Sequence, residues 1–343
     1  MGKNQHYIPR FALRNFTEDN NRQILTVYLM KEKRVITNAS IKNQAAKDFI
    51  YGKDQVIESI FEKIENVTAI TITKLMRNEV INDEEKEALR VYIHFQMNRT
   101  SFNAKNNNEI ANLVFQTIYH KHPFIGKYID KVKVELKNPY FLSFLLSIKT
   151  SGLLSDLAIN IVNNNSKIPF VLGQRPVFII NPYLYEKKLD IWAQGIAVKG
   201  VCVLLPIAFN KLIIMYDRWC YSLAKKNGII QINEDDITKI NIFQFFYTTD
   251  CAYIKKDMNI EYLNMLMEKT KIFRESDILD IKIIKTQNQS MLYQQSKIPE
   301  INPNISFIKI KYQAYCEKIV PTKETLARTA IIPEIIRLEN EEY

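Results

Sequence analysis

The sequence predicts an α+β fold, with a helical amino-terminal half packed on a mixed, mainly antiparallel sheet. Between positions 55 and 163, apolar residues recur mostly at three- and four-residue steps, the period of an amphipathic helix. After Asn165, short apolar runs are bounded by Pro, Gly and Asn, which is typical of strands. We therefore expect a boundary near Asn165 between residues 1–165 and 166–343, with a single interleaved domain as the alternative.

Residues 5–16, called the leader below, are rich in Phe, Ile and Leu, whereas the end of a chain is usually polar and loose. This composition predicts that the leader is docked on the body of the protein. Docking would bring His6, Arg10 and Arg14 to fixed positions.

The remaining elements follow from local patterns. Alternating apolar residues at 24–30 and 34–37 predict a hairpin. Acidic residues directly after Asn82 and Asn233 are typical of helix starts, because the helix dipole favours negative charge there. We expect helices at residues 55–78, 82–120 with a break near Asn106, 139–163 with a break at Gly152, 233–247, 258–269 and 333–341. We expect strands at residues 168–172, 177–180, 201–205, 212–216, 281–284 and 305–312.

Composition favours a soluble, cytoplasmic protein. Lys and Arg outnumber Asp and Glu by 47 to 37, a net charge of +10, which favours polyanions such as nucleic acid as partners. No secretory signal is recognisable, and the most apolar window, residues 201–214, is broken by Pro206, so no membrane span is expected. The cysteines form no C-x-x-C pair and are expected to be reduced and buried: Cys202, Cys220, Cys251 and Cys316.

The motif H-Y-I-P-R-F-x-L-R-x-F at residues 6–16 resembles the start of the family called domain of unknown function 4238. The resemblance covers roughly residues 4–255. Later landmarks follow in the family's order: Phe49-Ile50-Tyr51, Gln96-x-x-Arg99, residues 170–177 in place of F-I-x-x-D-x-P-V, Leu205-Pro206 and Asn241-x-x-Gln244. The family brings no established reaction. Its members look like bacterial accessory proteins, which implies a role in host defence or as a toxin.

The chain departs from the family at Gln174, where relatives usually carry an acid before the proline. If that acid holds a metal or acts as a base in relatives, this chain lacks the function. Gln174 and Arg175 instead suit a phosphate or carboxylate ligand.

The resemblance and the residue types together suggest a cationic pocket, with His6 and Arg99 close together. Imidazole can act as general acid or base on a phosphodiester, and guanidinium can hold the phosphoryl group. The candidate catalytic residues are His6, Arg10, Gln96 and Arg99, and the candidate substrate-binding residues are Tyr7, Arg14, Gln174, Arg175 and Asn241. The alternative for His6 and Tyr7 is that they only pin the leader through backbone hydrogen bonds.

Other polar groups have simpler interpretations. Arg90 and His94 share a helix face, where capping and ion pairs are the usual role. His120 and His122 have no further ligand at metal spacing, so an exposed basic helix end is expected. Glu58 begins an amphipathic helix, where acids are expected for dipole reasons, and a general-base role is a remote alternative.

Two functions are carried forward from the sequence, and a purely structural or protein-binding role stays open beside them. The first is a metal-independent nuclease acting on nucleic acid, RNA in particular. The second is a non-catalytic module that senses nucleic acid or a nucleotide. No P-loop, G-x-G-x-x-G, H-E-x-x-H or G-x-S-x-G motif is present, which argues against NTPases, dinucleotide enzymes, zincins and nucleophile-elbow hydrolases. We expect no cofactor and no metal, and a protein encoded by a neighbouring gene is a candidate partner.

Overall fold

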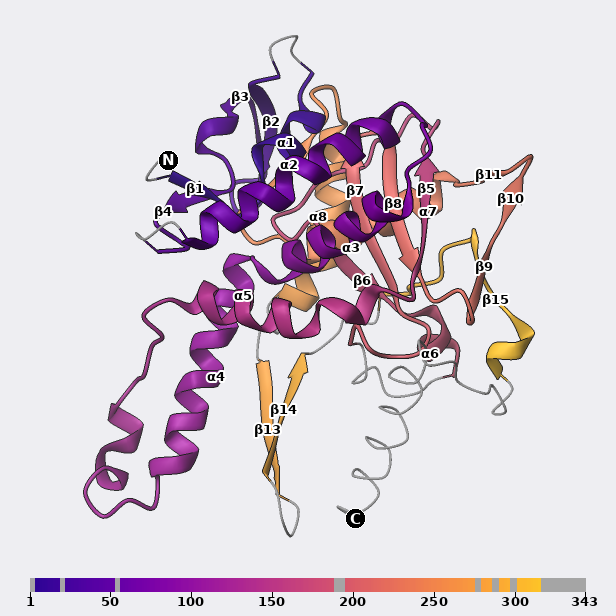
Figure 1. The fold of residues 1–343 in the computed structure, drawn as a ribbon. Helices are drawn as coiled ribbons and strands as arrows, with labels where there is room; N and C mark the ends of the chain where they lie inside the picture. Colours follow the sequence, from indigo (N-terminus) through magenta and orange to yellow (C-terminus); the bar gives the residue numbers. More distant parts are fainter. Residues whose placement is uncertain are drawn as a thin grey trace.

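A four-stranded antiparallel sheet lies at the centre of the fold, with strand order β5-β8-β7-β6. The computed structural model describes residues 4–18, 22–52, 56–187, 195–274, 279–285, 290–296 and 301–315. The strands of the central sheet are β5 (Ala158–Asn163), β6 (Phe178–Ile180), β7 (Cys202–Ala208) and β8 (Lys211–Tyr216). Figure 1 shows this sheet behind two long helices, α2 (Val56–Met76) and α3 (Asp83–Asn98).

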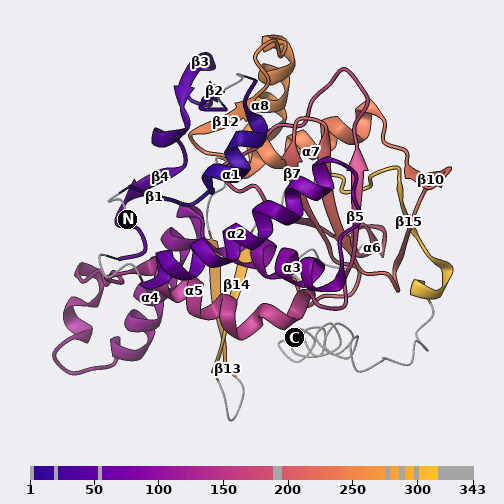
Figure 2. The same cartoon turned by 45° about the horizontal axis from the view of Figure 1, so that its top comes forward.

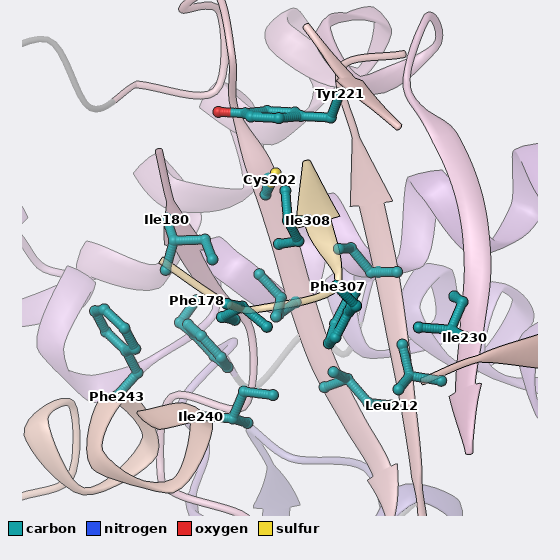
Figure 3. Close-up of a cluster of buried hydrophobic side chains, with 14 of the residues drawn as sticks. Phe178, Ile180, Cys202, Leu212, Tyr221, Ile230, Ile240, Phe243, Phe307 and Ile308 are labelled. Atoms are coloured by element: carbon teal, nitrogen blue, oxygen red, sulfur yellow. The ribbon is translucent and has the colours of Figure 1, made fainter. Parts of the chain in front are cut away.

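Helices cover both faces of the central sheet. Val203 and Leu205 of β7 pack in one apolar cluster with Leu89 of α3. The alternate residues of the same strand, such as Cys202 and Leu204, pack in another cluster with α7 (Glu234–Phe246), as Figure 3 shows for Cys202. Because side chains of a strand alternate between the faces, a strand buried on both sides needs a continuous apolar run. That requirement explains the sequence of β7.

A second sheet joins distant parts of the chain. The predicted hairpin is confirmed as β2 (Ile24–Leu29) and β3 (Arg34–Ser40), which pair antiparallel. The other edge of β2 pairs with β12 (Cys251–Ile254). Strand pairing therefore crosses position 165, and α8 (Ile260–Arg274) packs beside this sheet through Leu263.

The leader is docked, as its composition predicts. Its first strand, β1 (Asn4–His6), pairs with β4 (Ala46–Asp48), and a helical turn, α1 (Arg10–Leu13), and a 3-10 turn, η1 (Arg14–Phe16), follow. The side chains of Ile8 and Leu13 are fully buried.

A helical segment extends away from the body in both views of the ribbon (Figures 1 and 2). We call residues 101–150 the arm. It consists of α4 (Ser101–Tyr119), η3 (Gly126–Lys131) and α5 (Pro139–Thr150). The break expected near Asn106 is wrong: the chain breaks between α3 and α4, where the Thr100 hydroxyl caps α4 by accepting a hydrogen bond from Asn103 N at 3.2 Å.

Two further expectations are corrected. Residues 158–163 form strand β5 instead of continuing a helix, because they pair with β8 along its whole length. Residues 168–172 are extended but belong to no named strand, and Leu172 makes only an isolated bridge to Tyr253. The helix expected at 333–341 lies outside the described residues.

The other elements are short or peripheral. They are η2 (Ile41–Asn43), η4 (Ser151–Leu154), α6 (Pro182–Lys187), β9 (Tyr221–Leu223), β10 (Lys225–Lys226), β11 (Ile229–Ile230), β13 (Leu279–Lys285), β14 (Ser290–Ser296), β15 (Ile308–Ile310) and η6 (Tyr312–Tyr315). Every strand pair among the described residues is antiparallel. None of the helices in this part of the chain combines the length and the apolar character that a membrane crossing requires.

Candidate functional site

The leader is held to the body at the backbone carbonyl of Tyr7. Two side chains of the α3 end donate to this oxygen: Gln96 through Nε2 at 2.9 Å and Arg99 through Nε at 3.1 Å. Their i, i+3 spacing places both on one side of the helix end. A third contact comes from Tyr51, whose hydroxyl donates to the carbonyl of His6 at 3.2 Å. The backbone around His6 is therefore fixed from two sides.

The guanidinium of Arg99 is buried and its charge is compensated. Its side chain is only 4% exposed, and Nη1 lies 2.7 Å from Oε1 of Glu65 on α2. The Phe61 ring lies 4.5 Å from the guanidinium carbon. The third nitrogen, Nη2, is buried without a hydrogen-bond partner. Burial makes such a pairing necessary, because an unpaired buried charge is strongly destabilising.

The ring of His6, the residue directly before Tyr7, is oriented by the backbone. Nε2 lies 3.3 Å from the carbonyl oxygen of Ile41. A carbonyl can only accept, so Nε2 carries the hydrogen and Nδ1 keeps its lone pair in the neutral ring. Burial lowers the pKa of His6, and the charges of Arg10 and Arg99 lower it further, against the Ile41 hydrogen bond. At neutral pH the ring therefore carries no charge, and Nδ1 is its basic atom.

Glu58 on α2 is half-buried, and the charges of Arg10 and Arg99 act on it as they do on His6. Burial raises the pKa of its carboxyl, and the charge of Glu65 adds to this, while Arg99 and Arg10 act in the opposite direction. The charges of Arg10 and Arg99 thus act on the pKa values of both His6 and Glu58. We call His6, Arg10, Glu58, Glu65 and Arg99 the leader cluster. A base with a lowered pKa and an acid with a raised pKa are the combination that acid–base sites use.

Asn241 and Gln244 of α7 form hydrogen bonds with the backbone of residues 169–176, called the extended segment below. Asn241 accepts from Val171 N at 3.0 Å and donates to the carbonyl of Pro169 at 2.9 Å. One turn later, Gln244 accepts from Gly173 N at 2.7 Å and donates to the carbonyl of Pro176 at 2.8 Å. These side chains replace the partners that a neighbouring strand would supply. The hydrogen bonds also explain why residues 168–172 need no sheet.

Gln174 joins the same segment to the loop before β12. Its Oε1 accepts from the backbone nitrogens of Thr249 at 3.1 Å and Asp250 at 2.9 Å, and its Nε2 donates to Oδ2 of Asp250 at 3.0 Å. The hydroxyl of Tyr7 also hydrogen-bonds Gln174, which opposes the rise that burial causes in the pKa of Tyr7. Gln174 therefore connects the leader with the α7–β12 loop.

The two remaining candidate residues lie apart from this network. The guanidinium of Arg175 lies between two rings, 4.1 Å from the centre of Phe102 and 4.4 Å from that of Tyr247. It thus stacks between the start of α4 and the end of α7. Arg14 is exposed, and its carbonyl accepts from Arg22 at 3.2 Å. The candidate residues therefore divide between the leader cluster and contacts that join segments of the fold.

Arg90 and His94, for which the sequence favours a structural role, contact other parts of the fold. Arg90 pairs with Glu87 at 3.1 Å and donates to the carbonyl of Leu157. His94 is buried with Nε2 2.8 Å from the Thr150 hydroxyl. Within the described ranges, no group of three or more His, Cys, Asp or Glu side chains could hold a metal ion. The expectation that no metal is needed stays a prediction.

Sequence reasoning missed Glu65 and gave Glu58 little weight. A signal was present, because Glu58 and Glu65 are seven residues apart and so share one face of α2. The sequence does not predict that this face of α2 lies against Arg99, where Glu65 forms its ion pair. The leader also covers a small apolar pocket lined by Ile8, Tyr92 and Leu205, among others, with room for about one water molecule. A nucleotide does not fit there, so a substrate would meet the leader cluster from its exposed side, where Arg10 lies.

The family described as Protein of unknown function (DUF4238) matches residues 4–257. The chain belongs to this family. The matched region begins with the leader and includes both the Gln96/Arg99 pair and the Asn241/Gln244 pair. No curated protein and no solved structure matches the chain. In this member of the family, both helical pairs hydrogen-bond to the backbone of an extended segment.

Proposed function

We propose that this protein cleaves nucleic acid, RNA in particular, at the leader cluster without a metal ion. The observation that carries the proposal is the setting of His6: its Nε2 is bound to the Ile41 carbonyl, which leaves Nδ1 as the basic atom, and burial together with the charges of Arg10 and Arg99 lowers its pKa. A neutral imidazole next to an exposed guanidinium is suited to a phosphodiester, because one group moves a proton and the other binds the anion.

The residues would divide the work as follows. Nδ1 of His6 accepts the proton of the ribose 2′-hydroxyl, the 2′-oxygen attacks phosphorus, and the bond from phosphorus to the 5′-oxygen breaks. Glu58 in its protonated form supplies the proton to that leaving oxygen, and Arg10 binds the phosphate. Arg99 and Gln96 act as positioning residues, because their hydrogen bonds hold the backbone next to His6. The products are a 2′,3′-cyclic phosphate and a 5′-hydroxyl.

The test is incubation of the purified protein with total RNA and plasmid, with and without EDTA. Wild-type protein should cleave RNA in EDTA, and His6→Ala and Arg10→Ala should cleave much more slowly. Arg34→Ala is the matched control for Arg10→Ala, because Arg34 is also exposed but lies on β3. Thermal unfolding of each variant shows whether the fold is intact. Cleavage that requires a divalent metal, or that is unchanged in His6→Ala, would overturn the proposal.

The second candidate function is binding without turnover. It is favoured by the hydrogen bonds of Gln96, Gln174 and Asn241, which are used inside the fold and leave fewer groups for catalysis. In this case the protein would sense nucleic acid or a nucleotide and act through a partner protein, within host defence. Retention of RNA on a filter without cleavage, weakening steeply with salt, would favour this function over the first.

A further inference from the structure

The arm carries exposed aromatic rings and lysines at its outer end, far from the leader cluster in sequence. We propose that this end, residues 115–137 and called the arm tip below, binds single-stranded nucleic acid by stacking its bases on these rings. The inference rests on the proposed function in one respect, that nucleic acid is the ligand. It holds for both cleavage and binding without turnover.

Neighbouring rings at the arm tip form a connected row. The ring centres of Phe115 and Tyr119 are 4.8 Å apart, those of Tyr119 and His122 are 6.1 Å apart, and those of His122 and Phe124 are 6.3 Å apart. Two rings are largely in solvent: Phe124 is 79% exposed and Tyr128 is 61% exposed. Contiguous exposed apolar surface often marks an interaction site, and exposed aromatic rings are the usual platforms for bases.

The charge around these rings complements a phosphate backbone. The arm tip carries five lysines against two acids: Lys121, Lys127, Lys131, Lys133 and Lys137 against Asp130 and Glu135. All five lysines are exposed. Within the part of the chain that the structure describes, Lys133 alone among them forms an ion pair, with Glu135 at 3.2 Å, and both partners are largely in solvent. Such a pair is worth little and exchanges readily for a phosphate.

The arm tip is built as a fixed turn. Nδ1 of His122 accepts from the backbone nitrogens of Phe124 and Ile125, both at 3.3 Å. A Cβ on Gly126 would lie 2.3 Å from the carbonyl oxygen of His120, so only glycine allows this close return of the chain. A surface that is ordered before binding loses less entropy when a ligand binds.

The returning segment is also tied to α4. Asn112 and Asn108 accept hydrogen bonds from the backbone nitrogens of Val134 and Leu136, each at 2.9 Å. The lysines between Lys127 and Lys137 are therefore carried on a segment that runs beside the helix (Figure 1). This arrangement places the rings and the charges on the same projecting part of the protein.

Single strands fit this surface better than duplexes. Stacking on a protein ring needs a base whose face is free, and in a duplex the faces are covered by neighbouring bases. The exposed apolar residues of α5, such as Phe141 and Leu145, lie outside residues 115–137 and are not part of the proposal. They supply a control.

The test is fluorescence anisotropy with a labelled single-stranded oligothymidine, which lacks the 2′-hydroxyl that the proposed cleavage requires, and with the same strand in a duplex. We expect the single strand to bind more tightly. The double variant Phe124→Ala/Tyr128→Ala should weaken single-strand binding about 10- to 100-fold, the loss typical of one or two stacked bases. Phe141→Ala should leave binding unchanged. The affinity should fall with rising salt, and Lys121→Ala and Lys131→Ala should each make the negative slope of log affinity against log salt shallower by about 0.7.

Any of three outcomes would overturn the inference. The duplex could bind as tightly as the single strand, or the double variant could bind as tightly as wild type. The arm tip could also prefer anionic vesicles or a second copy of the chain. These failures are separable from those of the proposed function. Cleavage by wild type together with unaffected binding and cleavage in the double variant would reject the arm tip alone. Binding through the arm tip with no cleavage would reject only the catalytic role of His6.

Discussion

Nε of Arg99 lies 3.1 Å from the backbone carbonyl oxygen of Tyr7, 92 residues earlier in the chain. This contact connects the two most distinctive motifs of the amino-terminal half. It fixes the leader at the residue directly after His6 and brings that imidazole to a charged cluster. The same guanidinium pairs with Glu65, so one side chain both positions the leader and balances a buried charge.

Substitution of Arg99 should destabilise the protein in two steps. Arg99→Lys keeps a charge for Glu65 but loses the donor to Tyr7, which should cost about 1–3 kcal/mol of unfolding free energy. Arg99→Met also leaves Glu65 without its partner and should cost more. Urea unfolding measures both. Arg77→Lys is the matched control, because Arg77 is mostly exposed and makes only a 3.8 Å pair with Glu79, so a change within about 0.5 kcal/mol is expected.

Gly173→Ala should destabilise the contact between the extended segment and α7. An added Cβ would lie 2.3 Å from the Thr248 hydroxyl and 2.6 Å from the carbonyl of Gln244, so the segment must move and strain its hydrogen bonds. We expect a loss of about 1–3 kcal/mol in urea unfolding. Gly152→Ala is the control, since nothing lies within 4 Å of its added Cβ. Equal stability of the two variants would contradict the packing described here.

Stability should fall as the pH falls below 6.5, partly because of His94. Burial lowers the pKa of His94 in the folded protein. The unfolded chain therefore takes up the proton first, near pH 6.5, and this favours unfolding at lower pH. Melting temperatures of wild type and His94→Gln between pH 7.5 and pH 5 measure the effect. The variant should show a shallower dependence, and the slope that remains includes His6, whose pKa is also lowered. An identical slope would contradict the assignment.

Cleavage should depend on pH through both members of the acid–base pair. The pKa of His6 is lowered and its neutral form is the base, so activity should rise with a midpoint below pH 6.5. Activity should then fall at higher pH as Glu58 loses its proton. In Glu58→Gln the fall should disappear while the rise remains. Loss of the rise instead of the fall would show that the roles of the two residues are reversed.

Local signals predicted much of the fold. Asn82 and Asn233 begin helices as expected, and each forms a capping box with an acid three residues later. The hairpin of β2 and β3 was also visible, because both strands and their turn are contiguous. Strand β5 was missed, since its partner β8 lies about 50 residues later and an apolar run alone does not distinguish a strand from a helix.

In the candidate site, the sequence indicated which side chains share a helix face, but it did not indicate their hydrogen-bond partners. The spacing of Gln96 and Arg99 predicted a shared face of a helix, but not that both would donate to one carbonyl of the leader. The spacing of Asn241 and Gln244 likewise gave a face and not the segment that it holds. Partners so distant in sequence are set by tertiary packing. At the arm tip, the sequence predicted only an exposed basic helix end at His120 and His122, because spacing does not show which rings are exposed.

The most direct test of the central claim is the rate constant for RNA cleavage in EDTA, measured for wild type and for His6→Ala at equal concentrations of folded protein. If the docked leader supplies the general base, His6→Ala should be slower by about 100-fold or more, with unchanged RNA affinity. Equal rates for the two proteins, with the leader still docked, would contradict the account.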